Sequence, residues 1–390
     1  MKQILLLCPL LLLFLGSCTS SPVLLNQKFE SFQIQKINEN GIQNIQISPS
    51  SESWPLVQYK ESSAHTLVAK NIKFAVIGDT GCRLKESKGR QFYKNCHLSD
   101  EWPYVALAQT VAKEDYSFLV HTGDYHYREH CSDKKLCPIL SQSIGYGWDA
   151  WWDDFFKPSQ PLFQKGPILF VRGNHEDCSR AYSGWGPLSV NSKKFSDLCE
   201  EIEPYQWIEI QDLVMINFDD SAFEDKKTLS SDDVARWTKI LTDLKQRISK
   251  VKATKEIWFL SHKPVLGYFP NEEDAEPQEI NDNLRRLMKS TQLLSMLDYI
   301  LSGHVHSQQI ITTEANVTQI IVGHSGTALD PFGRRIQTSK LISTTENRKS
   351  FGYALFERTG FKKWNWIFKN KNGQQDLKCA VKTNTVKCAE

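Results

Sequence analysis

The sequence lacks an excess of charge of either sign. Lysine and arginine together number 47 and aspartate and glutamate 45 among 390 residues, and no stretch forms a basic stripe. Because nucleic acids and other polyanionic surfaces bind clustered positive charge, neither is an expected partner. Internal repeats and low-complexity tracts are also lacking, and the length suits one large domain or two ordinary ones.

A membrane-spanning segment is not expected at the N-terminus, although the chain begins with an apolar run. Ile4 to Leu15 is too short to span a bilayer comfortably, and Lys2 before it is typical of a signal peptide. The following Leu15-Gly16-Ser17-Cys18 resembles a bacterial lipobox, in which the cysteine is acylated. An ordinary secretory signal with an incidental cysteine is the alternative. We expect an exported bacterial lipoprotein, with residues 1–17 as signal peptide and Cys18 lipidated. It would lie on the outer or cytoplasmic membrane, on the periplasmic or cell-surface side.

The cysteine spacings do not suit a thiolate metal site. Of ten cysteines, Cys8 lies in the signal and Cys18 at its end, which leaves an even eight in local pairs. In an oxidising compartment a disulfide framework is the default. Spacing alone does not fix the connectivity, and pairing of nearest neighbours is the simplest hypothesis: Cys82–Cys96, Cys131–Cys137, Cys178–Cys199 and Cys379–Cys388.

The rest of the chain alternates between strand and helix patterns. Residues 18–70 are polar and are interpreted as a tether with an edge element, 71–370 as one large domain, and 371–390 as a tail with a disulfide. Apolar runs predict buried strands at 74–77, 118–120, 168–171, 213–216, 257–260, 299–301 and 320–322. Helical spacing is found at 103–113, 234–248 and 283–297. This alternation predicts an α/β fold with a two-sheet β-sandwich core flanked by helices.

Two further patterns concern packing. The runs at 353–356 and 361–368 flank Thr359-Gly360 and predict a hairpin, which we place on the second sheet. Aromatic residues between Trp148 and Phe156 form a helical stripe. A wall of a substrate site is one interpretation of this stripe, and a face turned to the core is the better-supported one at this spacing.

Residues with metal-ligand chemistry follow five of the predicted strands. Parallel strands bring their carboxyl ends to one edge of a sheet, so side chains on these loops should converge. A single motif of this kind is weak evidence, but five in the same setting are not expected by chance. The loops are Gly78-Asp79-Thr80-Gly81, Gly123-Asp124-Tyr125-His126-Tyr127, Gly173-Asn174-His175-Glu176, His262 and Gly303-His304-Val305-His306.

This set of motifs resembles the calcineurin-like metallophosphoesterases over about residues 71–330, and its tyrosine is similar to that of purple acid phosphatases. The region from Gly123 to Trp185 is also similar to exported bacterial members. The resemblance implies an αββα fold and two metal ions. The first would be Fe(III), held by Asp79, Tyr127 and His306. The second would be divalent Zn, Fe or Mn, held by Asn174, His262 and His304. Asp124 would bridge the two.

The resemblance also implies the reaction. A metal-bound hydroxide would attack the phosphorus of a small phosphorylated substrate, and His175 would act on the phosphoryl group or protonate the leaving group. Side chains of this kind more often lie in solvent or form salt bridges than bind substrate. Several cationic or polar side chains near the motifs are nevertheless candidates for substrate contact: Arg83, Lys85, His126, Arg128 and Arg172.

We therefore expect an exported, lipid-anchored phosphatase that hydrolyses phosphate monoesters and is similar to acid phosphatases. A phosphodiesterase or a nucleotide-cleaving phosphoesterase is one alternative, because the same metal centre serves those reactions. A catalytically silent surface binding protein is another, and the complete set of seven ligand residues argues against it.

Overall fold

A computed structural model gives the fold of the chain. It describes residues 30–50, 54–61, 72–87, 90–189, 199–223, 228–269, 278–280, 282–313, 315–330, 341–344 and 350–389. The predicted signal peptide and Cys18 lie outside these ranges. Among the described residues, no helix is both long enough and apolar enough to cross a membrane.

The larger sheet has ten strands, and its centre is parallel. Strands β4, β7, β8 and β1 pair in parallel, and antiparallel strands extend the sheet on both sides. In spatial order the strands are β21 (Thr385–Ala389), β20 (Gln375–Lys382), β19 (Lys363–Asn370), β18 (Gly352–Gly360), β4 (Lys73–Ile77), β7 (Phe118–His121), β8 (Ile168–Phe170), β1 (Phe32–Asn38), β2 (Gly41–Ser48) and β3 (Leu56–Glu61).

The second sheet has seven strands, of which β10, β11, β14 and β16 pair in parallel. Their order is β17 (Leu341–Thr344), β15 (Gln308–Thr312), β16 (Thr318–Val322), β14 (Tyr299–Ser302), β11 (Glu256–Leu260), β10 (Leu213–Asn217) and β9 (Gln206–Ile210). Two small hairpins stand apart from both sheets: β5 (Leu84–Ser87) with β6 (Arg90–Tyr93), and β12 (Tyr268–Phe269) with β13 (Gln278–Glu279).

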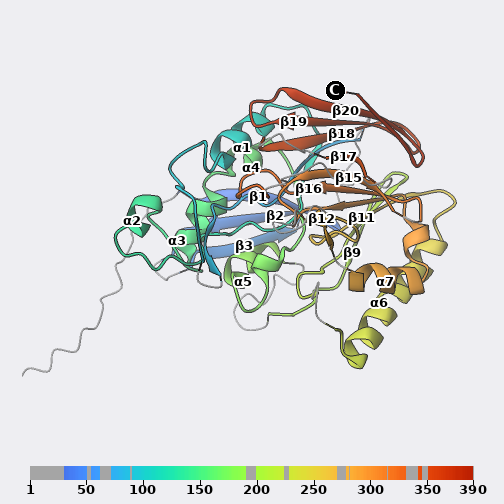
Figure 1. Ribbon diagram of the computed structural model, residues 1–390, viewed down its shortest axis with the longest axis horizontal. Helices are drawn as coiled ribbons and strands as arrows, with labels where there is room; N and C mark the ends of the chain where they lie inside the picture. The colour runs from blue at the N-terminus through green and yellow to red at the C-terminus, as the bar shows by residue number, and fades with distance from the viewer. Residues whose placement is uncertain are drawn as a thin grey trace, which may run out of the picture.

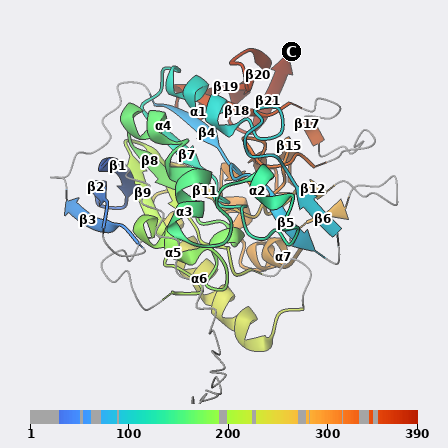
Figure 2. The same cartoon turned by 90° about the vertical axis from the view of Figure 1, so that its left-hand side faces the viewer.

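The two sheets pack face to face, and helices cover their outer faces. Successive side chains of β4 point to opposite faces of the sheet. Phe74 and Val76 face the second sheet, while Ala75 and Ile77 face helices. Figure 2 shows the helices that cover β4, β7 and β8, which are α1 (Tyr104–Ala112), α3 (Trp148–Trp151) with a π-helix (Trp152–Phe156), and α4 (Gln160–Lys165). Helices α6 (Ser231–Ser249) and α7 (Asp282–Ser290) cover the seven-stranded sheet, at the lower right of Figure 1.

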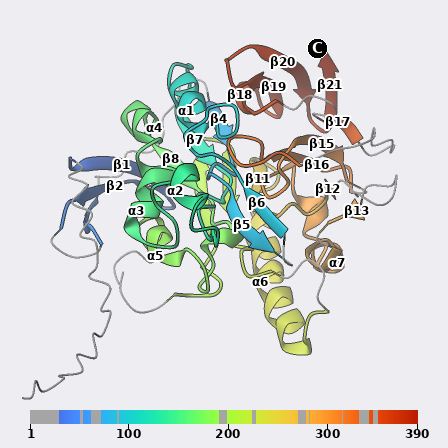
Figure 3. The same ribbon diagram turned by 60° about the vertical axis from the view of Figure 1, so that its left-hand side comes forward.

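The short helices lie in the loops. They are α2 (Cys137–Leu140), α5 (Tyr182–Trp185) and three 3-10 helices at Asn174–Glu176, Gly186–Leu188 and Leu294–Met296. Helix α2 and the β5–β6 hairpin lie side by side (Figure 3), where the backbone N–H of Ser132 donates to the Glu86 carboxylate.

The predicted α/β fold with two packed sheets and flanking helices is confirmed, and each of the seven predicted strands is present. The aromatic stripe faces the core, since Trp151, Phe155 and Phe156 are buried among the residues beneath the ten-stranded sheet. The hairpin at 353–368 is also present, but its predicted place was wrong. β18 pairs with β4, so the hairpin extends the first sheet and not the second.

Two boundaries differ from the sequence interpretation. The helix expected at 283–297 ends at Ser290, and the separate turn Leu294–Met296 follows it. The residues interpreted as a tail form β20 and β21, which continue the sheet without a break. The edge element expected within residues 18–70 corresponds to β1, β2 and β3, which form the other end of the same sheet because β1 pairs with β8.

Candidate metal centre

Five strand ends meet at one place in the molecule. Each predicted ligand loop begins one to three residues after a strand ends: the loop of Asp79 after β4, of Asp124 after β7, of Asn174 after β8, of His262 after β11 and of His304 after β14. The first three strands belong to one sheet and the last two to the other. The site therefore lies where the carboxyl ends of both parallel groups come together, as expected for this class of sheet.

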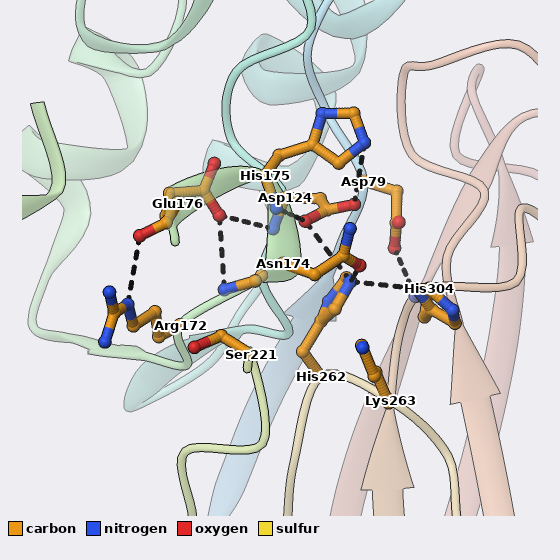
Figure 4. Close-up of polar contacts among 12 residues, drawn as sticks. Asp79, Asp124, Arg172, Asn174, His175, Glu176, Ser221, His262, Lys263 and His304 are labelled. Atoms are coloured by element: carbon orange, nitrogen blue, oxygen red, sulfur yellow. Dashed lines mark hydrogen bonds and ion pairs between the residues drawn. The ribbon is translucent and has the colours of Figure 1, made fainter. Parts of the chain in front are cut away.

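The first group of side chains surrounds one nitrogen of His262 (Figure 4). Its Nε2 lies 3.1 Å from Oδ1 of Asn174, 3.2 Å from Oδ1 of Asp124 and 3.3 Å from Nδ1 of His304. Its Nδ1 lies 2.8 Å from the Thr122 carbonyl oxygen, so in the neutral ring, which is the form that binds a metal ion, Nδ1 is the donor and Nε2 keeps a lone pair. Hydrogen-bond acceptors then face one another without a donor between them, and a bound cation would satisfy them. Ligand atoms of Asp124, His262 and His304 all lie within 4.8 Å of one another.

The second group surrounds the hydroxyl of Tyr127. This oxygen lies 2.6 Å from Oδ2 of Asp124, 3.2 Å from Oδ1 of Asp79 and 3.0 Å from Nε2 of His306. One hydroxyl proton cannot serve both carboxylate oxygens, so this group also suits a cation. Asp124 belongs to both groups, with Oδ1 turned to His262 and Oδ2 to Tyr127.

The charges in the site explain why two cations fit. Burial of the Asp124 carboxyl opposes its ionisation. The nearby rings of His175 and His262 outweigh burial and hold the pKa of this carboxyl well below its usual range. Burial also acts against charge on His262, but the Asp124 carboxylate raises its pKa to about 10. Burial and the carboxylates of Asp124 and Asp79 raise the pKa of the Tyr127 phenol. Only a strong Lewis acid would make this phenol bind as a phenolate.

Three of the predicted ligands have a left-handed backbone. The φ angle is 55° at Asp79, 55° at Asp124 and 70° at His304. Non-glycine residues seldom adopt this conformation, and it is concentrated at functional sites where the surrounding structure enforces it.

The glycine at position 173 has a separate purpose. A Cβ there would lie 2.2 Å from the backbone nitrogen of Asp124, so only glycine lets the two loops approach.

Glu176 ties the Asp124 loop to the Asn174 loop. Its Oε2 accepts hydrogen bonds from the backbone N–H groups of Asp124 (3.1 Å) and Gly173 (3.2 Å), and its Oε1 accepts from those of Tyr125 (2.9 Å) and His126 (3.3 Å). The side chain is fully buried. Glu176 therefore holds in place the backbone that presents the bridging carboxylate.

The predicted catalytic residue His175 lies beside this group. Its Nε2 is 3.7 Å from Oδ2 of Asp124, and its Nδ1 is 3.0 Å from Oε1 of Glu129 and 2.9 Å from Nη2 of Arg180. Arg180 also pairs with Glu129. Burial lowers the pKa of His175, and the Asp124 and Glu129 carboxylates oppose that shift. The Glu129 carboxylate, which Arg180 holds, and the His126 carbonyl oxygen, 3.1 Å from Nδ1, orient the ring so that Nε2 faces the predicted ligand Asp124.

The structure brings only some of the candidate substrate contacts to the site. Arg83 reaches it, with Nη2 2.8 Å from Nδ1 of His306. Arg128 is buried and pairs with Asp154 at 3.1 Å. Arg172 is buried, pairs with Asp219 at 3.0 Å and is drawn apart from the group around Asp124 in Figure 4. His126 is also buried, and its Nε2 lies 2.8 Å from the carbonyl of Gly145. The expectation that Arg172 and His126 contact substrate therefore finds no support in their positions.

Sequence reasoning missed three residues that shape the site. Glu129 and Arg180 hold His175, and Asp154 holds the loop of Tyr127 by accepting from its backbone N–H at 2.7 Å. Asp154 also accepts from the backbone N–H of Cys82 at 2.7 Å. None of the three follows a strand, so the pattern that found the ligands could not find them.

The four predicted disulfides are confirmed. The bonded pairs are Cys82–Cys96, Cys131–Cys137, Cys178–Cys199 and Cys379–Cys388. Two of them lie near the site. Cys82 shares the Asp154 contact with the Tyr127 loop, and Cys178 follows the 3-10 helix that carries Asn174 and His175.

Comparison with known proteins agrees with this geometry. A family model described as calcineurin-like phosphoesterase matches residues 72–308. A search of the curated proteins finds no significant match. Among solved structures, PhoD is similar with a TM-score of 0.54 and 12% identity, covering 90% of this chain and 77% of that one. A purple acid phosphatase from yellow lupin (Lupinus luteus) seeds is similar with a TM-score of 0.51 and 14% identity, over 86% of this chain. The match spans only 58% of the lupin chain. At these identities the likeness concerns the fold alone.

Proposed function

Because the chain belongs to the calcineurin-like phosphoesterase family, we propose that it is an exported dinuclear metallophosphatase that hydrolyses phosphate monoesters. One observation carries this proposal. The Asp124 carboxylate turns one oxygen to His262 and the other to Tyr127, so a single residue faces both groups of acceptors. A bridging carboxylate between two cations has this arrangement.

The residues present fit two different cations. Asp79, Tyr127 and His306 offer a carboxylate, a phenol oxygen and an imidazole, a set that suits Fe(III). Asn174, His262 and His304 offer an amide oxygen and two imidazoles, which suit divalent Zn, Fe or Mn. When bound, the pair of ions would polarise phosphoryl oxygens and acidify a water molecule.

His175 would handle the proton of the leaving group. The His126 carbonyl oxygen, 3.1 Å away, and the Glu129 carboxylate accept from Nδ1, which leaves Nε2 on the side of Asp124 to exchange a proton with the substrate oxygen. The imidazole plane is further held against the ring of Tyr127, with centroids 3.9 Å apart. The general acid is thus positioned before substrate arrives.

We also place the protein outside the cytoplasm, anchored through a lipid on Cys18. The support is the lipobox-like Leu15-Gly16-Ser17-Cys18 together with four disulfides, which persist in oxidising compartments. The substrate would therefore be a small phosphorylated compound of the cell envelope or the surroundings.

Metal analysis with a panel of phosphate mono- and diesters tests the activity. We expect two metal ions per chain and the highest kcat/KM on monoesters. Asp124→Asn should lose at least one ion and most turnover, while Asp100→Asn, on an exposed side chain, should behave as wild type. One ion per chain, or no ester hydrolysis by fully loaded protein, would contradict the proposal. A higher kcat/KM on diesters than on monoesters would instead support the phosphodiesterase alternative.

A further inference from the structure

Three cationic side chains gather beside the metal centre. Arg83 and Lys85 stand on either side of Leu84, and because Leu84 is fully buried, the two flanking side chains leave the opposite face of the chain. Leu84 also bridges to Arg128 next to Glu129. Arg180 reaches the same place from the other side and pairs with Glu129. All three cations are half-buried, so a solute can reach them.

Only one of these charges is neutralised. Arg180 has Glu129 as its partner, but within the described part of the chain neither Arg83 nor Lys85 forms a salt bridge. Arg83 makes its hydrogen bonds to the ring of His306, and its buried Nε has no partner among the described residues. The Lys85 ammonium makes no hydrogen bond to any described residue.

The three charges are close enough to act on one another. Burial lowers the pKa of Lys85, and the guanidinium groups of Arg180 and Arg83 lower it further, against the pull of Glu129 and Asp124. The ammonium therefore lies within electrostatic reach of both arginines and of the bridging carboxylate. Like charges held together repel, and an anion bound among them relieves the repulsion.

The anion that fits best has two charges and several oxygens. Arg83 and Lys85 together supply two positive charges without a salt-bridge partner among the described residues, and a phosphate monoester carries about −1.5 to −2 at neutral pH. Arginine and lysine donors also match the tetrahedral set of phosphate oxygens better than the two oxygens of a carboxylate.

We propose that Arg83, Lys85 and Arg180 bind a second phosphoryl group of the substrate while the first lies at the metal centre. The substrate class is thus a phosphate ester that carries another phosphoryl group on the same molecule. This inference rests on the proposed function, because it assigns the metal centre to the phosphoryl group that is hydrolysed.

Two substrates that differ only in this group test the inference. Propyl phosphate and propane-1,3-diyl bisphosphate are compared by kcat/KM with wild type, Lys85→Met and the control Lys378→Met, whose lysine is exposed on β20. Wild type should prefer the bisphosphate by about 10-fold or more, and Lys85→Met should lose about 10-fold of that preference. Lys85→Arg should retain it, and so should Lys378→Met. An equal preference in wild type and Lys85→Met would overturn the proposal.

Calorimetry with non-hydrolysable analogues separates this result from the activity itself. Propane-1,3-bisphosphonate should bind wild type about 10-fold more tightly than propylphosphonate, and Lys85→Met should remove the difference. If wild type hydrolyses neither ester, the proposed function fails while the binding difference still decides the inference. A carboxylate analogue, 3-carboxypropylphosphonate, that binds as tightly as the bisphosphonate would refute the assignment to a phosphoryl group.

Discussion

The Tyr127 hydroxyl lies 2.6 Å from Oδ2 of Asp124, the carboxylate oxygen that faces away from His262. This contact places a phenol oxygen among the predicted ligands of one of the two expected ions. A phenolate bound to Fe(III) donates charge to the metal and gives a visible absorption band.

Tyr127→Phe should therefore remove the colour of the iron-loaded, oxidised protein. The substitution takes away the oxygen and leaves the ring, which is buried and can still pack against His175. We expect loss of the visible band, weaker iron retention and an unchanged thermal unfolding profile. Absorption spectra and metal analysis of both proteins check this. A colourless wild type that is fully active with zinc or manganese alone would make Tyr127 structural.

His175→Ala should retain both ions and lose turnover. The side chain approaches Asp124 only at 3.7 Å and is held by Glu129, so its removal takes a proton carrier without removing a predicted ligand. A loss of roughly 10²–10⁴-fold in kcat is expected for such a group. Glu129→Gln should lose less, because the ring remains and only its orientation is weakened. Full activity of metal-replete His175→Ala would refute the assignment.

Removal of the Cys178–Cys199 disulfide should destabilise the protein more than removal of Cys131–Cys137. Their sequence separations are 21 and 6 residues, and a longer closed loop restricts the unfolded chain more. Double serine variants should lose about 3 and about 2 kcal/mol of unfolding free energy respectively. Denaturant unfolding measures both, and an inverted order would count against a chain-entropy origin.

The buried His324 should make the protein less stable in acid. Burial lowers its pKa to about 4, and its Nδ1 has no hydrogen-bond partner among the described residues. An unfolded histidine has a pKa of about 6.5, so between these values the unfolded chain binds a proton that the folded chain does not. Stability thus rises with pH through this window and falls as pH drops from about 6.5 to 4.

The contribution of His324 amounts to about 3 kcal/mol. His324→Gln cannot titrate, so wild type should lose about that much more stability than the variant between pH 7 and pH 4. Urea unfolding at several pH values gives the difference. The exposed His97→Gln should follow wild type throughout. Parallel curves for wild type and His324→Gln would show that position 324 does not contribute.

Cys18→Ser should release the protein from membranes or block its processing. The prediction comes from the lipobox-like segment, since residues 1–29 lie outside the described ranges. Membrane fractionation and intact mass check it. Unchanged fractionation and mass in the variant would leave an ordinary secretory signal as the better interpretation.

The sequence was informative where local pattern and topology agree. Buried parallel strands appear as short apolar runs, and side chains with ligand chemistry follow the carboxyl ends of β4, β7 and β8 in one sheet and of β11 and β14 in the other, so the ligand loops could be predicted. Apolar runs do not say which sheet a strand joins, and the hairpin of β18 and β19 was therefore misplaced.

The supporting contacts of the site could not be predicted in this way. Glu129 and Arg180 are 51 residues apart in sequence, and Asp154 lies 27 residues beyond Tyr127, on a π-helix that packs against the sheet. Such contacts depend on how loops pack in three dimensions, and they leave no periodic trace.

The left-handed backbone at Asp79, Asp124 and His304 narrows the evolutionary routes open to this site. Asparagine, aspartate, histidine and glycine tolerate that conformation far better than β-branched residues do. A homologue that loses the metal site would therefore retain one of these few residue types at the three positions until its loops adopt another backbone conformation. A library of variants at these three positions, in which protein abundance and activity are measured separately, should show that only these few residue types keep the protein abundant. Such a pattern would mark where the chain is constrained by conformation and not by reactivity.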